Sequence, residues 1–127
     1  MANVAVRTRV KHINTEKEGE FKPYDVYKYP GYHVHQLLEG VDTTRFLCQI
    51  NMIEPGMKKV HSHDGENFLV ILEGEGDYYT EENSTIPVKA GDFCHALPFE
   101  IHGIKCTGTK PIKYLAIEGP RERRTRS

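Results

Sequence analysis

Residues 55–74 read PGMKKVHSHDGENFLVILEG, and this stretch decides the fold. It opens on Pro55-Gly56, where proline presets a turn and glycine accepts a positive φ. It then places His61 and His63 two residues apart. In a strand, side chains at i and i+2 leave the same face, with Cα atoms about 6–7 Å apart. Two imidazoles spaced in this way can meet one ion, so the stretch predicts a strand that carries a pair of metal ligands.

On both sides of this stretch, turn signals alternate with short runs of β-branched, aromatic and apolar residues. No segment keeps a 3.6-residue period over three turns, so helices are not expected. Many short strands with closely spaced turns are typical of an all-β sandwich or barrel. We expect strands or extended segments over Val4–His12, Tyr24–Tyr29, Tyr32–Leu38, Thr44–Ile53, Met57–His63, Phe68–Leu72, Asp77–Thr80, Thr85–Val88, Phe93–Leu97, Ile101–Cys106 and Ile112–Ile117.

The 127 residues of the chain fit one domain. Seventeen Lys and Arg against eighteen Asp and Glu leave a formal charge of -1, which argues against nucleic acid as a partner. No apolar run approaches the length of a membrane span, and the first ten residues, MANVAVRTRV, lack the apolar region of a signal peptide. We therefore expect a soluble, cytoplasmic protein with no membrane partner.

The three cysteines are widely spaced and odd in number, which fits neither a disulfide framework nor a zinc site with paired cysteine ligands. Histidine is the more informative residue, with seven in the chain. A metal held by His61 and His63 needs a further ligand, and His102 is placed to supply it at the start of a later strand. Three imidazoles suit Fe, Zn, Cu and Ni better than Ca or Mg.

Two segments resemble the sequence motifs of the cupin superfamily. Pro55 to His63, followed by Glu66 to Gly74, is similar to the first cupin motif, and Gly91-Asp92 through Pro98 to His102 is similar to the second, with the same ten residues between its glycine and histidine. The resemblance implies a small single-domain cupin, whose fold is a double-stranded β-helix, also called a jelly roll. It also implies that His61, His63 and His102 hold one divalent transition metal inside the barrel, with Fe, Mn, Ni, Cu and Zn as candidates.

One position departs from the cupin pattern. The family's glutamate ligand normally follows the second histidine by four residues, and here that position is Asn67, with Glu66 just before it. Either Asn67 offers an amide oxygen, or a local bulge lets Glu66 turn inward as the alternative ligand. Asn67 shares its odd parity with His61, His63 and the apolar positions of the following strand, which favours Asn67. Without an anionic ligand the ion keeps its full charge, which favours an anionic or enolate substrate.

The resemblance implies an enzyme that acts on a small polar or anionic organic molecule, of the dioxygenase, isomerase, lyase or cyclase type. The alternative is a non-catalytic cupin that binds a small molecule without turnover. His95, on the strand before Pro98, is our candidate for a general acid or base, because the intrinsic pKa of histidine lies near neutral pH.

The domain is expected to comprise N-terminal strands and a loop (1–40), a barrel core (41–118) and a basic tail (119–127). The alternating strand from Val4 to Val10 lies outside the minimal barrel and has an apolar face. Such a strand pairs with an open sheet edge, its own or a partner's, so we expect a homodimer.

Overall fold

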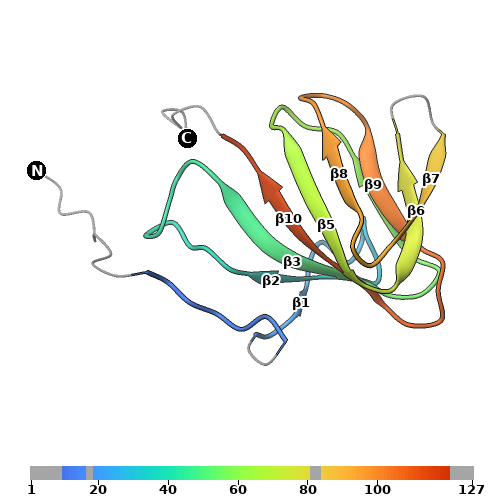
Figure 1. The fold of residues 1–127 in the computed structure, drawn as a ribbon, viewed down its shortest axis with the longest axis horizontal. Helices are drawn as coiled ribbons and strands as arrows, with labels where there is room; N and C mark the ends of the chain where they lie inside the picture. The colour runs from blue at the N-terminus through green and yellow to red at the C-terminus, as the bar shows by residue number, and fades with distance from the viewer. Residues whose placement is uncertain (1–9, 17–18, 81–83, 121–127) are drawn as a thin grey trace, which may run out of the picture.

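A computed structural model describes residues 10–16, 19–80 and 84–120 of the chain. All regular structure in these residues is β-strand, which confirms the expected all-β class (Figure 1). None of the described residues forms a helix long and apolar enough to cross a membrane. The strands are β1 (Lys22–Pro23), β2 (Tyr32–Gln36), β3 (Leu47–Ile53), β4 (Lys58–His61), β5 (Asn67–Glu73), β6 (Glu75–Tyr79), β7 (Thr85–Lys89), β8 (Phe93–Ala96), β9 (His102–Cys106) and β10 (Ile112–Glu118).

The strands form two antiparallel sheets. The larger sheet has the order β1-β2-β3-β10-β5-β8, and the smaller one has the order β4-β9-β6-β7. Every sheet contains neighbours that are far apart in the sequence, such as β3 beside β10 and β4 beside β9. These long crossings between two facing sheets are those of a jelly roll.

The core lies between the two sheets and is filled by residues that alternate along the strands. In β5, Leu69 and Ile71 are buried at 3% and 1% exposure, while Phe68 and Val70 between them are half-buried. Ile53 and Ile104, from opposite sheets, are fully buried in the same cluster. Each such side chain contributes about 1.5–3 kcal/mol on burial. Side chains that alternate along each strand therefore point either into the apolar interior or toward the outer face of the sheet.

The pairing of β4 with β9 positions two of the candidate ligands. In this ladder His61 lies directly opposite His102. Gly103, the next residue, has a φ of 154°, and a Cβ at this position would overlap the carbonyl oxygen of Lys59. The two backbones approach so closely that glycine is required there.

Most of the expected strands are confirmed to within one or two residues at each end. The expectation for Tyr24–Tyr29 was wrong, because this segment folds into turns. The N–H groups of Lys28 and Tyr29 both donate to the carbonyl oxygen of Asp25, at 3.1 and 2.8 Å, and Asp25 itself has a φ of 49°. The strand expected over Val4–His12 lies outside the described residues, except for residues 10–12, which are not in a strand.

Candidate metal centre

Three histidines from β4, the segment after it and β9 converge at one end of the barrel. His61, His63 and His102 each offer one ring nitrogen, and these three atoms lie within 4.8 Å of one another. The centroids of the three rings are 4.7 Å apart in every pair. His102 is buried, and His61 and His63 are half-buried, so solvent reaches part of the cluster. Among the described residues this is the arrangement of donors that fits a metal ion.

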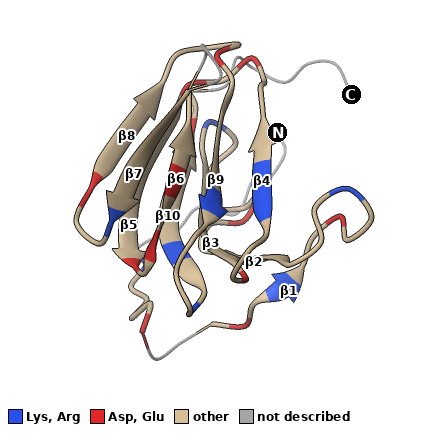
Figure 2. Ribbon diagram, turned by 90° about the vertical axis from the view of Figure 1, so that its right-hand side faces the viewer, with Lys and Arg blue, Asp and Glu red and all other residues tan. Residues whose placement is uncertain are grey.

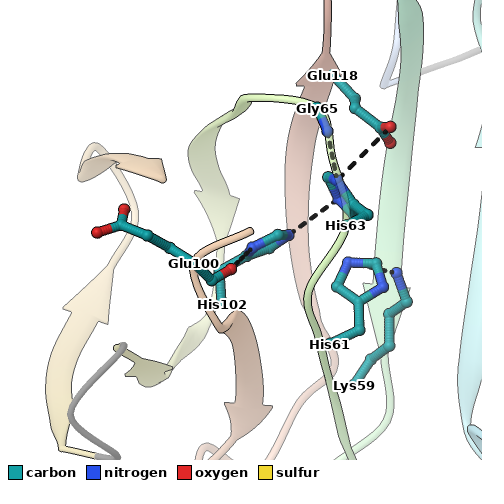
Figure 3. A network of polar contacts seen from close by, with 7 residues as sticks. All are labelled: Lys59, His61, His63, Gly65, Glu100, His102 and Glu118. Carbon is teal, nitrogen blue, oxygen red and sulfur yellow. Dashed lines mark hydrogen bonds and ion pairs between the residues drawn. The ribbon is translucent and has the colours of Figure 1, made fainter. Parts of the chain in front are cut away.

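Hydrogen bonds to the backbone hold two of these rings in place (Figure 3). Nδ1 of His102 lies 2.9 Å from the carbonyl oxygen of Glu100, so Nδ1 donates and Nε2 keeps its lone pair. That Nε2 is 3.1 Å from Nε2 of His63. The N–H of Gly65 is 3.3 Å from Nδ1 of His63, and the N–H of Phe99 donates to the carbonyl oxygen of His63 at 2.7 Å. The loop before β9 is thus tied to the loop after β4.

Burial keeps two of the imidazoles neutral. The pKa of His61 is lowered to about 3, first by burial and then by the neighbouring groups Lys59, His102 and His63. Burial also lowers the pKa of His102 to about 4, although its hydrogen bond to the Glu100 carbonyl acts in the opposite direction. A neutral imidazole is the form that binds a metal. His61 and His102 are therefore in their metal-binding form at neutral pH.

A carboxylate that the sequence did not single out lies behind His63. Glu118, at the end of β10, places Oε2 3.7 Å from Nδ1 of His63, and its side chain is 18% exposed. In the β5–β10 ladder Glu118 is the partner of Asn67, the position where the cupin pattern has its glutamate. The signal was present in the sequence, because Glu118 shares the parity of the buried Tyr114 and Ala116, but the pairing of β10 with β5 was not known.

Asn67 and Glu66 point to different faces of the sheet. Asn67 is 8% exposed and continues the interior row of Leu69 and Ile71, as parity suggested. Glu66 accepts from Nε2 of His95 at 2.9 Å, in a half-exposed pair. The structure therefore does not bring Glu66 into the histidine cluster. Ligation by Asn67 stays a prediction.

His95 does not lie with the three histidines. Its side chain is 37% exposed, it is stacked on Phe68 at 4.7 Å between ring centroids, and it is paired with Glu66. In β8 the residues on either side of it, Cys94 and Ala96, are the less exposed ones. His95 thus occupies the outer face of the larger sheet. A catalytic role for it stays a prediction that this placement does not support.

A lysine flanks the cluster inside the barrel. Nζ of Lys59 is 3.3 Å from Nε2 of His61, and the ammonium also lies 4.8 Å from the ring centroid of Tyr32. Burial lowers the pKa of Lys59 to about 8, and the carboxylate of Glu118 opposes this shift. At neutral pH the lysine therefore still carries its charge for most of the time. Sequence analysis missed Lys59 because a lysine on a short strand is usually an outward-facing, solvated residue.

The donor set fits a divalent transition metal. Three imidazoles are a ligand set for Fe, Zn, Cu or Ni, and the hydrogen bond from His102 to Glu100 is the kind that fixes the ring of a metal-binding histidine. Nδ1 of His63 accepts from the N–H of Gly65, and the carboxylate of Glu118 lies 3.7 Å from the same nitrogen, at the distance of an ion pair. The three histidines would hold the ion, and Glu118 would orient one of them.

Comparison with known proteins finds a relative of similar sequence. Over 59 residues the chain is 37% identical to a protein of Thermotoga maritima named oxalate-binding protein, an alignment that covers 46% of this chain and 48% of that protein. The chain thus matches about half the length of this relative.

Two solved structures share the fold. The polyketide cyclase RemF from Streptomyces resistomycificus superposes with a TM-score of 0.77 at 16% identity, over 89% of this chain and 81% of that one. A structure described as a predicted oxalate decarboxylase, from Thermotoga maritima, superposes with a TM-score of 0.75 at 24% identity, over 87% of this chain and 100% of that one. Other similar structures are described as cupins or as double-stranded β-helix proteins, which confirms the expected fold.

The family itself is given by the match to a family model. Residues 50–118, from the middle of β3 to the end of β10, match the Cupin_2 model, which describes a cupin domain. This range holds both motifs and all three clustered histidines. Since the match covers more than half of the 127 residues, the chain belongs to the Cupin_2 family of cupin domains.

Proposed function

We propose that this cupin is a mononuclear metal-dependent enzyme that acts on a small anionic organic molecule. The observation that carries the proposal is the convergence of His61, His63 and His102, whose ligand atoms lie within 4.8 Å of one another. One divalent ion of Fe, Mn, Ni, Cu or Zn is the expected cofactor. Three protein ligands leave coordination positions open, as in catalytic rather than structural metal sites.

The charge around the cluster supports an anionic substrate. Burial keeps His61 and His102 neutral, and Lys59 adds a positive charge beside them. A bound metal supplies a Lewis acid that stabilises negative charge on a substrate oxygen. The carbonyl oxygen of Glu100 orients the ring of His102, and burial keeps His61 and His102 neutral. The names of the similar proteins, an oxalate-binding protein and a polyketide cyclase, agree with a small oxygen-rich molecule but leave a dioxygenase, isomerase, lyase or cyclase reaction open.

The second candidate is a cupin that binds such a molecule without turnover. Two observations favour it: Asn67 stands where an anionic ligand is found in the family pattern, and the similar Thermotoga maritima protein is named for binding. Both candidates bind a small molecule, but the binding cupin does not require the metal, so absence of metal after reconstitution favours it. They differ in whether the bound molecule is changed, which product analysis by mass spectrometry decides.

Metal analysis of the purified protein tests the proposal. We expect about one transition-metal ion per chain after reconstitution, and a loss of stoichiometric metal in His61→Ala, His63→Ala and His102→Ala with the β fold retained. The matched control is His33→Ala, since His33 pairs with Glu54 at 2.7 Å, outside the cluster. Absence of metal from the reconstituted wild-type protein would contradict the proposal. Full metal occupancy in His102→Ala would remove that residue from the ligand set.

A further inference from the structure

We propose that Lys59 binds a second acid group of the ligand, so that the site selects a small dicarboxylate over a monocarboxylate. One carboxylate would occupy the open side of the metal centre, and the other would pair with the Lys59 ammonium. The inference rests on the proposed function, since it takes the three histidines as the metal site, but it names a residue and a substrate class that the metal site alone does not give.

The position of Lys59 in the barrel is the first observation. It lies on β4 two residues before His61, so both side chains leave the same face of the strand. Its partner in the ladder is Ile104, which is fully buried. The neighbouring Lys58 faces the other way and is exposed. Lys59 is thus the lysine of this strand that turns inward, toward the histidines (Figure 3).

The surroundings of the ammonium are the second observation. Nζ lies 3.3 Å from Nε2 of His61, 4.8 Å from the ring centroid of Tyr32 and 5.5 Å from that of Tyr29. Lys11 and Lys113, in contrast, reach carboxylates at 2.7 and 3.9 Å. Within the described residues, no ion pair within 4 Å joins Lys59 to a carboxylate. An aromatic enclosure holds the cation in place without neutralising it.

The charge of the loaded site is the third observation. A divalent ion on three neutral imidazoles, together with the ammonium, carries three positive charges, and Glu118 near His63 supplies one negative charge. This excess of positive charge would favour a dianion over a monoanion. Figure 2 shows that the basic segments of β4 and β9 lie side by side, where Lys58 is the ladder partner of Lys105.

Geometry limits the length of the ligand. The ammonium is one hydrogen bond from a ring of the metal cluster, so the two acid groups must be joined directly or through a short carbon spacer. Tyr29 lies beside the same two residues, because its ring centroid is 6.4 Å from that of His61 and 5.5 Å from Nζ of Lys59. A monocarboxylate held at the metal would form no ion pair with the ammonium, so it would gain less binding energy than a dicarboxylate.

Calorimetric titration of the metal-loaded protein with oxalate, malonate and acetate tests the inference. The variants are Lys59→Met, which keeps the apolar stem, and Lys59→Arg, which keeps the charge. The control is Lys58→Met, which removes the same charge from the outer face of the same strand. We expect Lys59→Met to weaken binding of oxalate or malonate at least tenfold and binding of acetate less than threefold. Lys59→Arg should restore part of the loss, and Lys58→Met should change either affinity less than threefold.

The metal content of each variant is measured alongside, which separates the two proposals. If the wild-type protein holds one ion but binds acetate as well as the dicarboxylates, the inference about Lys59 is wrong and the metal site stands. The same holds if Lys59→Met, with its metal retained, binds all three probes as the wild type does, or if it loses affinity for all three equally. If the wild-type protein takes up no metal, both proposals fail.

Discussion

At the scale of single residues, the departure from the cupin pattern at position 67 has a structural counterpart one strand away. Asn67 is buried on β5, and its ladder partner on β10 is Glu118, whose carboxylate faces His63. A carboxylate is therefore present near position 67, but it lies beside Nδ1 of His63 and is not one of the three clustered ring donors. Such a carboxylate orients a histidine without occupying a coordination position.

Asn67→Glu tests whether position 67 faces the ion. If it does, the variant adds a carboxylate ligand. The Coulomb attraction between a carboxylate and a divalent ion is stronger than the attraction between an amide oxygen and the same ion. We expect metal affinity, measured by competition with a chelator, to rise by about tenfold or more. Binding or turnover of an anionic substrate should fall, because the added carboxylate takes an open position and reduces the net charge.

Glu66→Gln is the matched comparison for that experiment. Because Glu66 is paired with His95 at the outer face, its neutralisation should leave metal affinity within about threefold of the wild type. An unchanged affinity in Asn67→Glu, together with a large loss in Glu66→Gln, would show that Glu66 turns inward and that position 67 was assigned wrongly.

At the scale of strands, the metal centre depends on how closely β4 and β9 approach each other. Gly103→Ala places a methyl group against the carbonyl oxygen of Lys59 and the Cα of Val60. We expect it to lower the free energy of unfolding by about 2–3 kcal/mol and to weaken metal binding, because His61 and His102 face each other across this ladder. Urea denaturation and chelator competition measure the two effects. Gly40→Ala is the control, since no atom lies within 4 Å of its added Cβ; equal stabilities of the two variants would contradict the expectation.

The strands themselves were predictable because their signals are local. Alternation over Phe68–Leu72 and turn residues such as Ala90-Gly91-Asp92 act within a few positions, and the structure places β5 and β8 accordingly. The conformation of Tyr24–Tyr29 was not predictable, because aromatic composition favours a strand while hydrogen bonds to Asp25 close a turn. This turn brings Tyr29 to Lys59.

The metal centre likewise combines residues with local sequence signals and residues whose roles depend on contacts between distant strands. His61 and His63 were found from their spacing, and His102 from the second motif, and the structure brings all three together. Glu118 and Lys59 acquire their roles only through pairing between distant strands, β10 with β5 and β4 with β9. Ladder register depends on the whole fold, so the roles of these two residues could not be assigned from a single sequence.

At the scale of the whole molecule, assembly is open to a direct test. The apolar alternation from Val4 to Val10 predicts a strand that pairs with a sheet edge, and large apolar side chains such as Phe93 and Phe99 are 62% and 69% exposed. Exposed apolar surface of this kind marks interaction sites. We expect sedimentation equilibrium at micromolar concentration to give a homodimer of twice 14.6 kDa. A species of only 14.6 kDa would contradict this, and removal of residues 1–9 should shift the equilibrium toward monomer.

The stability of the metal-free protein should depend on pH through His61 and His102. In the unfolded chain their pKa is about 6.5, whereas burial lowers it to about 3 for His61 and about 4 for His102 in the folded protein. Between these values the unfolded state binds more protons than the folded state, so protonation favours unfolding. We therefore expect the free energy of unfolding to fall as the pH drops below about 6.5, down to about pH 4. Urea denaturation at a series of pH values measures the slope, which should be smaller in the double variant His61→Gln/His102→Gln. A slope that is the same in wild type and double variant would mean that other groups cause the pH dependence.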